Sequence, residues 1–259
     1  MNQIPKEVQE SDVIFCSHSG GKDSQAMLAL MIRMGLKDKI VLVHSDLGDM
    51  EWETMHPWIE SISFGLPVNV VQSEMDFFEM ARKYKRLPSG QQQFCTDFLK
   101  ITPIASFIHA YMTKHNLKTA INATGMRAEE SKRRALKSPF EKSDMTQPRK
   151  YPGHLIYEWL PIFDYKVADV YKEIQDAGQV PHKIYSMGFS RLSCVFCING
   201  RIDEHKKAAE LRPELASKMA KLERDLGKTI RLKQVKGVKM QKYLDEYLDI
   251  KKDSPGSSF

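Results

Sequence analysis

Residues 17–24 near the start of the chain combine the residue types that hold phosphate. The segment reads S-H-S-G-G-K-D-S and stands between a short apolar run and an amphipathic stretch. Adjacent glycines let several backbone N–H groups point into one concavity, and the N-terminus of a following helix adds partial positive charge there. The lysine adds a full charge, and the hydroxyls donate hydrogen bonds. The predicted anion-binding residues are Ser17, Ser19, Gly20, Gly21, Lys22, Asp23 and Ser24.

This segment differs from two common nucleotide-binding patterns. The pattern G-x-x-x-x-G-K-[ST] requires a glycine where Cys16 stands and a hydroxyl residue where Asp23 follows Lys22. The dinucleotide pattern G-x-G-x-x-G is absent from the sequence. The segment therefore indicates a phosphate loop of another kind.

The elements that must position this loop alternate along the chain. From residue 12 to about residue 164, short β-branched runs alternate with helical patterns, which predicts an α/β fold with a mostly parallel sheet and flanking crossover helices. Residues 132–153 are charged and rich in proline, and we expect a long surface loop there. The five predicted strands are residues 13–16, 40–43, 68–71, 120–124 and 155–162.

Length and composition describe an ordinary globular protein. The chain has 259 residues, of which 42% are hydrophobic and 28% charged. Its longest apolar stretch, residues 26–32, is far shorter than the roughly 20 residues of a membrane span, so no membrane partner is expected. Residues 1–11 lack the apolar core of a secretory signal, and we therefore expect a cytoplasmic protein.

The four cysteines suggest a second kind of chemistry. Cys194 and Cys197 form a C-x-x-C pair, and Cys95 stands alone. Four cysteines in a chain of this length do not make a disulfide framework, and in a reducing compartment they indicate a metal, a cluster or redox chemistry. Cys16 lies inside the first predicted strand, where we expect a buried apolar thiol.

Several motifs together resemble one known family. The segment S-G-G-K-D-S resembles the pyrophosphate loop of the adenine nucleotide alpha-hydrolase superfamily. Residues 125–131, G-M-R-A-E-E-S, resemble the G-x-R-x-x-E-S segment of the phosphoadenosine phosphosulfate (PAPS) reductase family, and residues 160–165, 184–191 and the cysteine pair are similar to it in order and spacing. The resemblance covers roughly residues 12–201.

The resemblance implies a site for an adenine nucleotide, either ATP or PAPS. Lys22 and Arg127 would stabilise charge on the phosphates, with Mg²⁺ accompanying ATP. Arg127 would follow the carboxyl end of a strand, where an arginine is well placed for a bidentate contact with phosphate. For both Arg127 and Arg191, the alternative role is a salt bridge within the protein. For Asp46, the alternative to a nucleotide contact is that it begins a turn. The further nucleotide-binding residues implied are His44, Asp46, Gly125, Arg127 and Arg191.

Residues 95–103, C-T-D-F-L-K-I-T-P, resemble the cluster-binding segment of the family's iron–sulfur members, with Thr96 in place of a second cysteine. The resemblance implies a four-iron four-sulfur cluster with three ligands, Cys95, Cys194 and Cys197, and either one open iron or a non-cysteine ligand. Zinc with His182 or His205 as fourth ligand, and a plain redox pair, are the alternatives.

One departure from the family decides which reaction we expect. Sulfonucleotide reductases use a C-terminal Cys-Gly nucleophile, but no cysteine follows Cys197 here. Family members that lack it include proteins of DNA sulfur modification. We therefore expect nucleotide-dependent sulfur transfer or activation, with a thiol reductant or a sulfur-donor protein as partner. The alternatives are a reductase with an atypical nucleophile and a non-catalytic subunit that binds nucleic acid.

We expect a nucleotide-binding domain over residues 1–200 and a helical, basic extension over residues 201–259. The extension holds fifteen Lys or Arg against ten Asp or Glu, a difference of +5 out of the net charge of +6. Part of the extension is a run of cationic residues without acidic residues between them, which indicates either a nucleic-acid contact or a solvated face. The run without acidic residues consists of Lys228, Arg231, Lys233, Lys236, Lys239 and Lys242.

Overall fold

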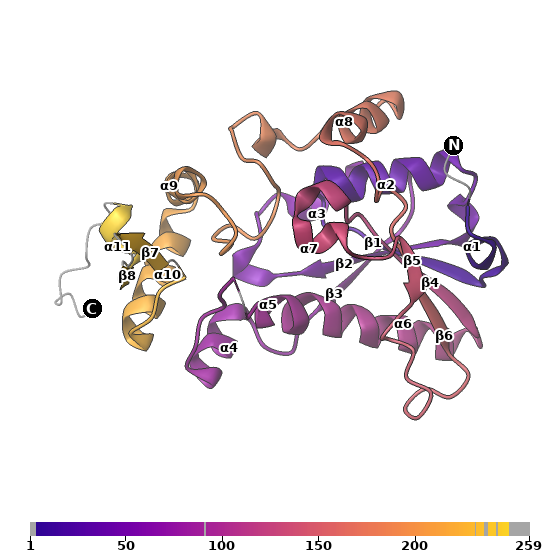
Figure 1. Cartoon of the computed structure of the whole chain (residues 1–259), viewed down its shortest axis with the longest axis horizontal. Helices are drawn as coiled ribbons and strands as arrows, with labels where there is room; N and C mark the ends of the chain where they lie inside the picture. Colours follow the sequence, from indigo (N-terminus) through magenta and orange to yellow (C-terminus); the bar gives the residue numbers. More distant parts are fainter. Residues whose placement is uncertain (1–3, 91, 231, 236–237, 242, 249–259) are drawn as a thin grey trace. The chain divides into compact units, whose positions relative to one another are not determined.

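The computed structural model describes residues 4–90, 92–230, 232–235, 238–241 and 243–248 (Figure 1). The chain divides into two compact units, and the segments of the two units alternate along the sequence. The expected domains were instead two continuous stretches, residues 1–200 and 201–259. Unit 1 consists of Met1–Asp46, Glu53–Gln72 and Lys100–Ser193. Unit 2 consists of Leu47–Trp52, Ser73–Leu99 and Cys194–Phe259.

Unit 1 is built on a six-stranded sheet with the strand order β3-β2-β1-β4-β6-β5. All pairs are parallel except β5 with β6, which confirms the predicted mostly parallel α/β class. The strands are β1 (Val13–Ser17), β2 (Ile40–Asp46), β3 (Val68–Gln72), β4 (Thr119–Thr124), β5 (Phe140–Lys142) and β6 (Leu155–Trp159).

The expected count of five strands was one too low. The additional strand, β5, lies inside the segment that we expected to be a surface loop. Three residues are too few to show an alternating hydrophobic pattern, and β5 is held by its antiparallel pairing with β6 rather than by its own sequence.

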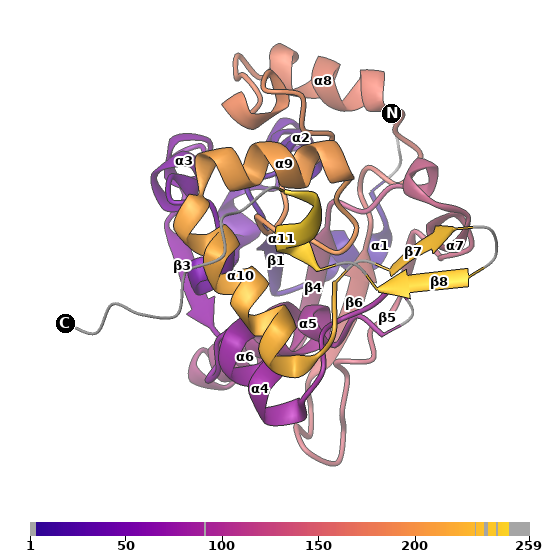
Figure 2. The same ribbon diagram turned by 90° about the vertical axis from the view of Figure 1, so that its left-hand side faces the viewer.

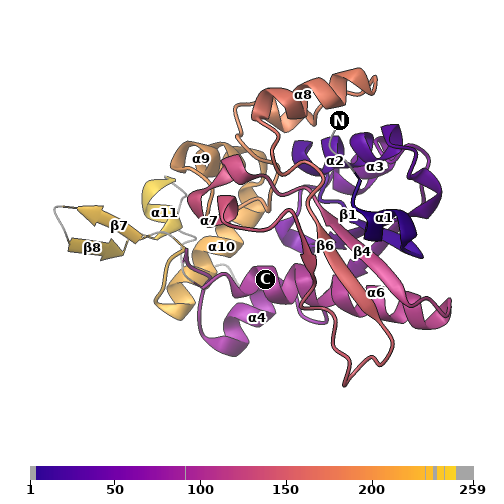
Figure 3. The ribbon, with the colours of Figure 1, turned by 45° about the vertical axis from the view of Figure 1, so that its right-hand side comes forward.

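Helices cover both faces of this sheet (Figure 1). On one face α2 packs on α8 through Ala26, Val170 and Ile174. On the other lies α6, and Figure 3 shows it beside the paired strands β4 and β6. The helices and short turns of unit 1 are α1 (Lys6–Glu10), α2 (Lys22–Arg33), η1 (Lys37–Lys39), α3 (Met55–Ser61), α6 (Thr102–Lys114), η4 (Ala128–Glu130), α7 (Lys132–Ala135), α8 (Val167–Asp176) and η5 (Lys183–Tyr185).

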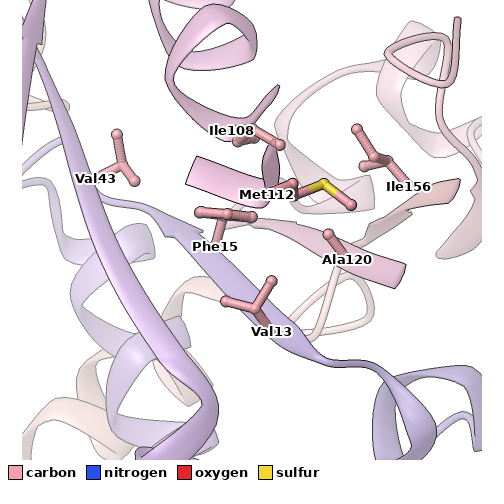
Figure 4. Packing of buried hydrophobic residues seen from close by; sticks show 7 residues of the cluster. All are labelled: Val13, Phe15, Val43, Ile108, Met112, Ala120 and Ile156. Carbon is pink, nitrogen blue, oxygen red and sulfur yellow. The ribbon is translucent and has the colours of Figure 1, made fainter. Parts of the chain in front are cut away.

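The core under α6 fixes β1, the strand that leads into the candidate loop. Ile108 and Met112 of the helix pack against Phe15 of β1 (Figure 4). The Phe15 ring also meets Phe107 and Tyr111 edge-on, at centroid distances of 6.2 and 5.4 Å. A central parallel strand is covered on both faces, which is why its sequence is a continuous apolar run.

Unit 2 is mainly helical. Its α10 begins at a proline, ends at the left-handed Gly227, and contacts α9, α11 and α4 (Figure 2). A two-stranded antiparallel hairpin, β7 with β8, lies in the part we expected to be helical. The elements are η2 (Gly48–Met50), α4 (Phe77–Tyr84), α5 (Phe94–Thr96), α9 (Ile202–Leu211), α10 (Pro213–Leu226), β7 (Leu232–Val235), β8 (Val238–Gln241) and α11 (Leu244–Tyr247); the π-helical turn η3 (Asp97–Ile101) follows α5.

Most of the basic run falls where the structure describes no side chains. Arg231, Lys236 and Lys242 lie outside the described residues. Lys233 lies on β7 and Lys239 on β8, where only the backbone is described. The nucleic-acid contact of this run therefore stays a prediction.

Among the described residues, no helix has the length and apolar character that crossing a bilayer requires.

Candidate nucleotide-binding site

The candidate loop has the expected strand–loop–helix setting in unit 1. Strand β1 ends at Ser17, and α2 begins at Lys22 with Gly21 as its N-cap. The His18 N–H donates to the Val43 carbonyl at 2.8 Å, so the loop leaves the sheet still tied to the neighbouring strand. This setting directs the first N–H groups of α2 toward the loop.

Gly20 lets the loop turn tightly beneath α3. Its φ is +73°, a left-handed conformation that glycine adopts without strain. A Cβ at this position would lie 2.4 Å from the Met55 Sδ atom. The Gly20 carbonyl accepts a hydrogen bond from Trp58 Nε1 at 2.9 Å. The outer side of the loop is therefore closed by α3.

Two buried histidines support the loop from below. Gly20 N–H donates to His18 Nδ1 at 3.1 Å, so the neutral ring carries its proton on Nε2. Burial, with a smaller effect of His44, lowers the pKa of His18 to about 3, and the ring is neutral at physiological pH. His44 Nδ1 lies 3.0 Å from the His18 carbonyl oxygen, to which it donates. Sequence reasoning placed His44 in the site but gave His18 no role.

The loop's hydroxyls bond to one another across the turn. Ser24 Oγ donates to the Gly21 carbonyl at 2.9 Å and lies 3.3 Å from Ser19 Oγ. The Ser19 N–H donates to Ser24 Oγ at 3.3 Å. These bonds hold the loop in one conformation, and they bring together two of the predicted hydroxyl donors.

Three charged side chains form a row at the start of α2, with a half-buried carboxylate between two buried cations. The Asp23 carboxylate lies 3.0 Å from Lys22 Nζ and 2.6 Å from Arg127 Nε. Lys22 is 6% exposed and Arg127 is 3% exposed. Arg127 also donates through Nη1 to Glu129, at 2.7 Å, and to the Tyr165 carbonyl. The structure thus brings Lys22 and Arg127 together around a carboxylate of the protein, and their contacts with nucleotide phosphates stay predictions.

Gly125 allows the end of β4 to approach the helix. A Cβ on Gly125 would lie 2.8 Å from both the Asp23 carbonyl carbon and the Ser24 nitrogen. Only a residue without a side chain permits this distance between two backbones. The role of Gly125 is to place Arg127 against the N-terminus of α2.

The remaining predicted residues of the site differ in their placement. Ser17 Oγ donates to Asn122 Oδ1 of β4 at 3.1 Å, so this hydroxyl is bonded within the sheet. Asp46 ends β2 and is half-buried. Arg191 is exposed, and within the described chain it makes no ion pair. The structure leaves the nucleotide contacts of these three residues as predictions.

Tyr185 is a member of the site that sequence reasoning missed. Its hydroxyl oxygen accepts the N–H of Lys22, the first residue of α2, at 2.9 Å. The residue belongs to residues 184–191, I-Y-S-M-G-F-S-R, whose order and spacing resemble the family but whose aromatic residues were given no role from the sequence. A phenol has no characteristic spacing from a phosphate loop, so only the fold shows the contact.

The three candidate metal ligands all belong to unit 2. Cys95 lies in α5, and the Cys197 N–H donates to the Cys194 carbonyl at 3.1 Å across a turn. All four cysteines of the chain are thiols, and these three are half-buried. Within the described residues, no three His, Cys, Asp or Glu side chains are placed to hold a metal ion together. The cluster stays a prediction, and we derive no step through it.

The two histidines proposed as zinc ligands have other contacts. His182 Nδ1 accepts the Ile184 N–H at 3.1 Å, and its ring meets Trp58 edge-on in unit 1. His205 Nε2 lies 2.8 Å from the Cys197 carbonyl oxygen. A Cβ on Gly200 would lie 2.9 Å from that same nitrogen, so glycine is needed beside the cysteine turn.

A family model for the phosphoadenosine phosphosulfate reductase domain matches residues 13–199. The chain belongs to this family. The match includes the loop, the Gly125–Arg127 connection, Tyr185 and all four cysteines. Membership agrees with the resemblance found in the motifs, and it supports a PP-loop nucleotide-binding domain.

Two curated relatives of this chain come from Methanocaldococcus jannaschii, and both are uncharacterised. One is 25% identical over 207 residues, which is 79% of this chain and 40% of the relative. The other is 25% identical over 205 residues, which is 78% of this chain and 45% of the relative. The chain thus spans less than half the length of either relative.

Solved structures with a similar backbone fold include a phosphoadenylyl-sulfate (PAPS) reductase from Candida auris in a phosphate complex. It is 12% identical, with a TM-score of 0.48, covering 74% of this chain and 89% of that one. Another is the FMN adenylyltransferase of Candida glabrata in complex with FAD and inorganic pyrophosphate, 16% identical, with a TM-score of 0.46, covering 72% and 56%.

Proposed function

We propose that this PAPS reductase-family protein binds the phosphates of an adenine nucleotide on residues 17–24 and uses them in sulfur transfer or activation. The observation that carries the proposal is the family match over the loop together with the loop's own geometry: a strand–glycine–helix turn with Lys22 and Arg127 at the start of α2. Backbone N–H groups and two buried cations at one point favour a polyanion.

The proposed reaction begins with ATP. An oxygen of the acceptor attacks the α-phosphorus, the bond to the β-phosphate oxygen breaks, and pyrophosphate leaves. Hydrosulfide supplied by a donor protein then attacks the acceptor carbon that bears the adenylated oxygen, the carbon–oxygen bond breaks, and AMP leaves with that oxygen. Lys22 would stabilise the negative charge that develops on the leaving phosphates, because its ammonium is held at the N-terminus of α2. Mg²⁺ would bind phosphate oxygens, which are the hard ligands that it prefers.

The family match favours a second candidate, reduction of PAPS with an atypical nucleophile. A thiolate must attack the sulfate sulfur in that reaction. Cys16 is fully buried in β1, and this burial raises its pKa far above its usual range, which disfavours this thiol as the nucleophile. The candidates that remain in the chain are the half-buried Cys95, Cys194 and Cys197.

Calorimetric titration with ATP, PAPS and inorganic pyrophosphate tests the proposal. We expect binding that weakens at least about tenfold in Lys22→Met, because a charge-assisted contact is lost. The matched control is Lys114→Met at an exposed end of α6, which should bind within twofold of the parent protein. A chain that binds none of the three ligands would contradict the proposal.

Product analysis separates the two reactions. Pyrophosphate released from ATP in the presence of an acceptor supports sulfur transfer, whereas sulfite released from PAPS with a thiol reductant supports reduction. If the nucleotide binds but neither product forms, the protein is the non-catalytic subunit that we considered from the sequence.

A further inference from the structure

Tyr185 holds the phosphate loop by accepting two backbone hydrogen bonds on one oxygen. Besides the Lys22 N–H at 2.9 Å, its hydroxyl oxygen accepts the Leu192 N–H at 3.3 Å. The ring is fixed as well, since Lys22 Nζ lies 5.3 Å from its centroid and Tyr171 meets it edge-on at 6.4 Å. The phenol oxygen therefore has a defined position beside the first residue of α2.

The hydroxyl still has its own proton to donate. A phenol oxygen accepts about two hydrogen bonds and donates one. Both accepting positions are used by N–H groups, and no residue in the described part of the chain accepts a hydrogen bond from Tyr185. Burial raises the pKa of Tyr185 above its usual range, and the charge of Asp23 adds to this effect. The group is therefore protonated at neutral pH.

Gly21 lies directly beside this hydroxyl. A Cβ built on Gly21 would lie 3.5 Å from Tyr185 Oη, 3.5 Å from Ser19 Oγ and 3.5 Å from the Leu192 carbonyl oxygen. These are ordinary van der Waals distances, so a methyl-sized group fits here without a clash. Two hydroxyls thus border one small space over the N-cap of α2.

We propose that Tyr185 donates its hydroxyl hydrogen bond to a phosphate oxygen of the nucleotide bound over Gly21. The inference rests on the proposed function, because the ligand is the polyanion assigned to the loop. Tyr185 lies in the segment after α8. It adds a hydrogen-bond donor to a site otherwise made of residues 17–24 and of residues 125–127, which follow β4. The two hydrogen bonds that the Tyr185 oxygen accepts also orient the phenol. Because both donors are backbone N–H groups, the hydroxyl proton points away from the backbone.

The test measures the affinity for inorganic pyrophosphate by calorimetry in Tyr185→Phe and Gly21→Ala. Tyr185→Phe keeps the ring over Lys22 and should weaken binding about tenfold, the value of one hydrogen bond to a charged group. Gly21→Ala puts a methyl in the same space and should weaken binding at least as much, with the fold kept because Gly21 has a φ of −75°. The matched control is Tyr84→Phe, an exposed tyrosine of α4, and it should bind within twofold of the parent protein.

The double variant separates a direct contact from a loosened loop. If Tyr185 and the Gly21 space serve the same phosphate, Gly21→Ala with Tyr185→Phe binds no more weakly than Gly21→Ala alone. Losses that multiply would show that Tyr185 acts only on the loop's structure and would overturn the inference. Where Tyr185→Phe fails to fold, unchanged affinity in Gly21→Ala overturns it, and a loss supports it.

Failure of the inference is distinguishable from failure of the proposed function. If the parent protein binds neither pyrophosphate nor ATP, the proposed function is wrong and the inference falls with it. If the parent protein binds pyrophosphate and Tyr185→Phe binds it equally well, only the role of Tyr185 is wrong.

Discussion

The candidate phosphate loop of unit 1 and the cysteine segments of unit 2 were both predicted from the sequence, but the contacts that the structure shows for them differ. The loop is held by contacts from four other segments of the chain, through Val43, Trp58, Arg127 and Tyr185. The three cysteines form no group that could hold a metal among the described residues. The difference teaches that consecutive residues make a site as soon as their strand and helix form, whereas ligands from separate segments need the whole fold or a metal to gather them.

The largest effect that would test the rigidity of the loop is expected for Gly125→Ala. The new methyl would lie 2.8 Å from backbone atoms of α2, which cannot move aside as a side chain can. We expect a loss of about 3 kcal/mol or more in the free energy of unfolding. Urea denaturation measures it, with Gly90→Ala as control, because a Cβ there would meet nothing within 4 Å. Equal stability of the two variants would mean that β4 does not hold the loop.

A smaller loss is expected when the carboxylate between the two cations is removed. Asp23→Asn leaves the buried Lys22 and Arg127 without their shared partner, and we expect a cost of about 2 kcal/mol. Because pyrophosphate supplies new negative charge to both cations, it should raise the midpoint of thermal unfolding more in this variant than in the parent protein. The control is Asp176→Asn, which breaks an exposed pair with Lys172. Equal midpoint shifts would argue against an anion beside these cations.

His18 should make the stability of the loop depend on pH. The folded protein keeps this ring neutral down to about pH 3, whereas the unfolded chain protonates it below about pH 6.5. The unfolded state then binds more protons, so stability falls as the pH is lowered, by at most about 1.4 kcal/mol per pH unit.

His18→Asn keeps an acceptor near the Nδ1 position but removes the titration. Urea unfolding of the two proteins at pH 7 and at pH 5 should therefore show the stability advantage of the parent protein shrinking by about 2 kcal/mol at the lower pH. An advantage that is the same at both values would mean that His18 is not buried in neutral form.

The smallest effect on stability is expected in unit 2, where Cys95→Ser should change the free energy of unfolding by less than about 0.5 kcal/mol. In the metal-free native protein, the three half-buried thiols should react with a thiol reagent, and Cys16 should react only after unfolding.

Reconstitution with iron and sulfide under nitrogen would sharpen the comparison. If the predicted cluster forms, the three thiols become protected together, and Cys95→Ser removes the protection of Cys194 and Cys197 at once. If Cys95, Cys194 and Cys197 react with the thiol reagent equally well before and after reconstitution, the cluster prediction is wrong.

Much of the fold could be predicted because strongly patterned segments form the same element in any surroundings. The five parallel strands and α2 were of this kind, and so was the loop between them. The strand β5 and the hairpin of β7 with β8 were missed because short antiparallel pairs are stabilised by their partners rather than by their own periodicity. The interleaving of the two units was also missed, since a contact between distant segments leaves no local pattern.

The sequence by itself determined the class of the fold, the family and the place of the candidate phosphate loop, because each depends on residues that are adjacent or regularly spaced. Tertiary structure alone decided that Asp23 joins Lys22 to Arg127, that His18 lies neutral beneath Gly20, and that the hydroxyl of Tyr185 meets the first turn of α2. The physical reason is that burial sets the charge state of His18, whereas hydrogen bonds between segments far apart in the sequence place Arg127 and Tyr185 at the start of α2.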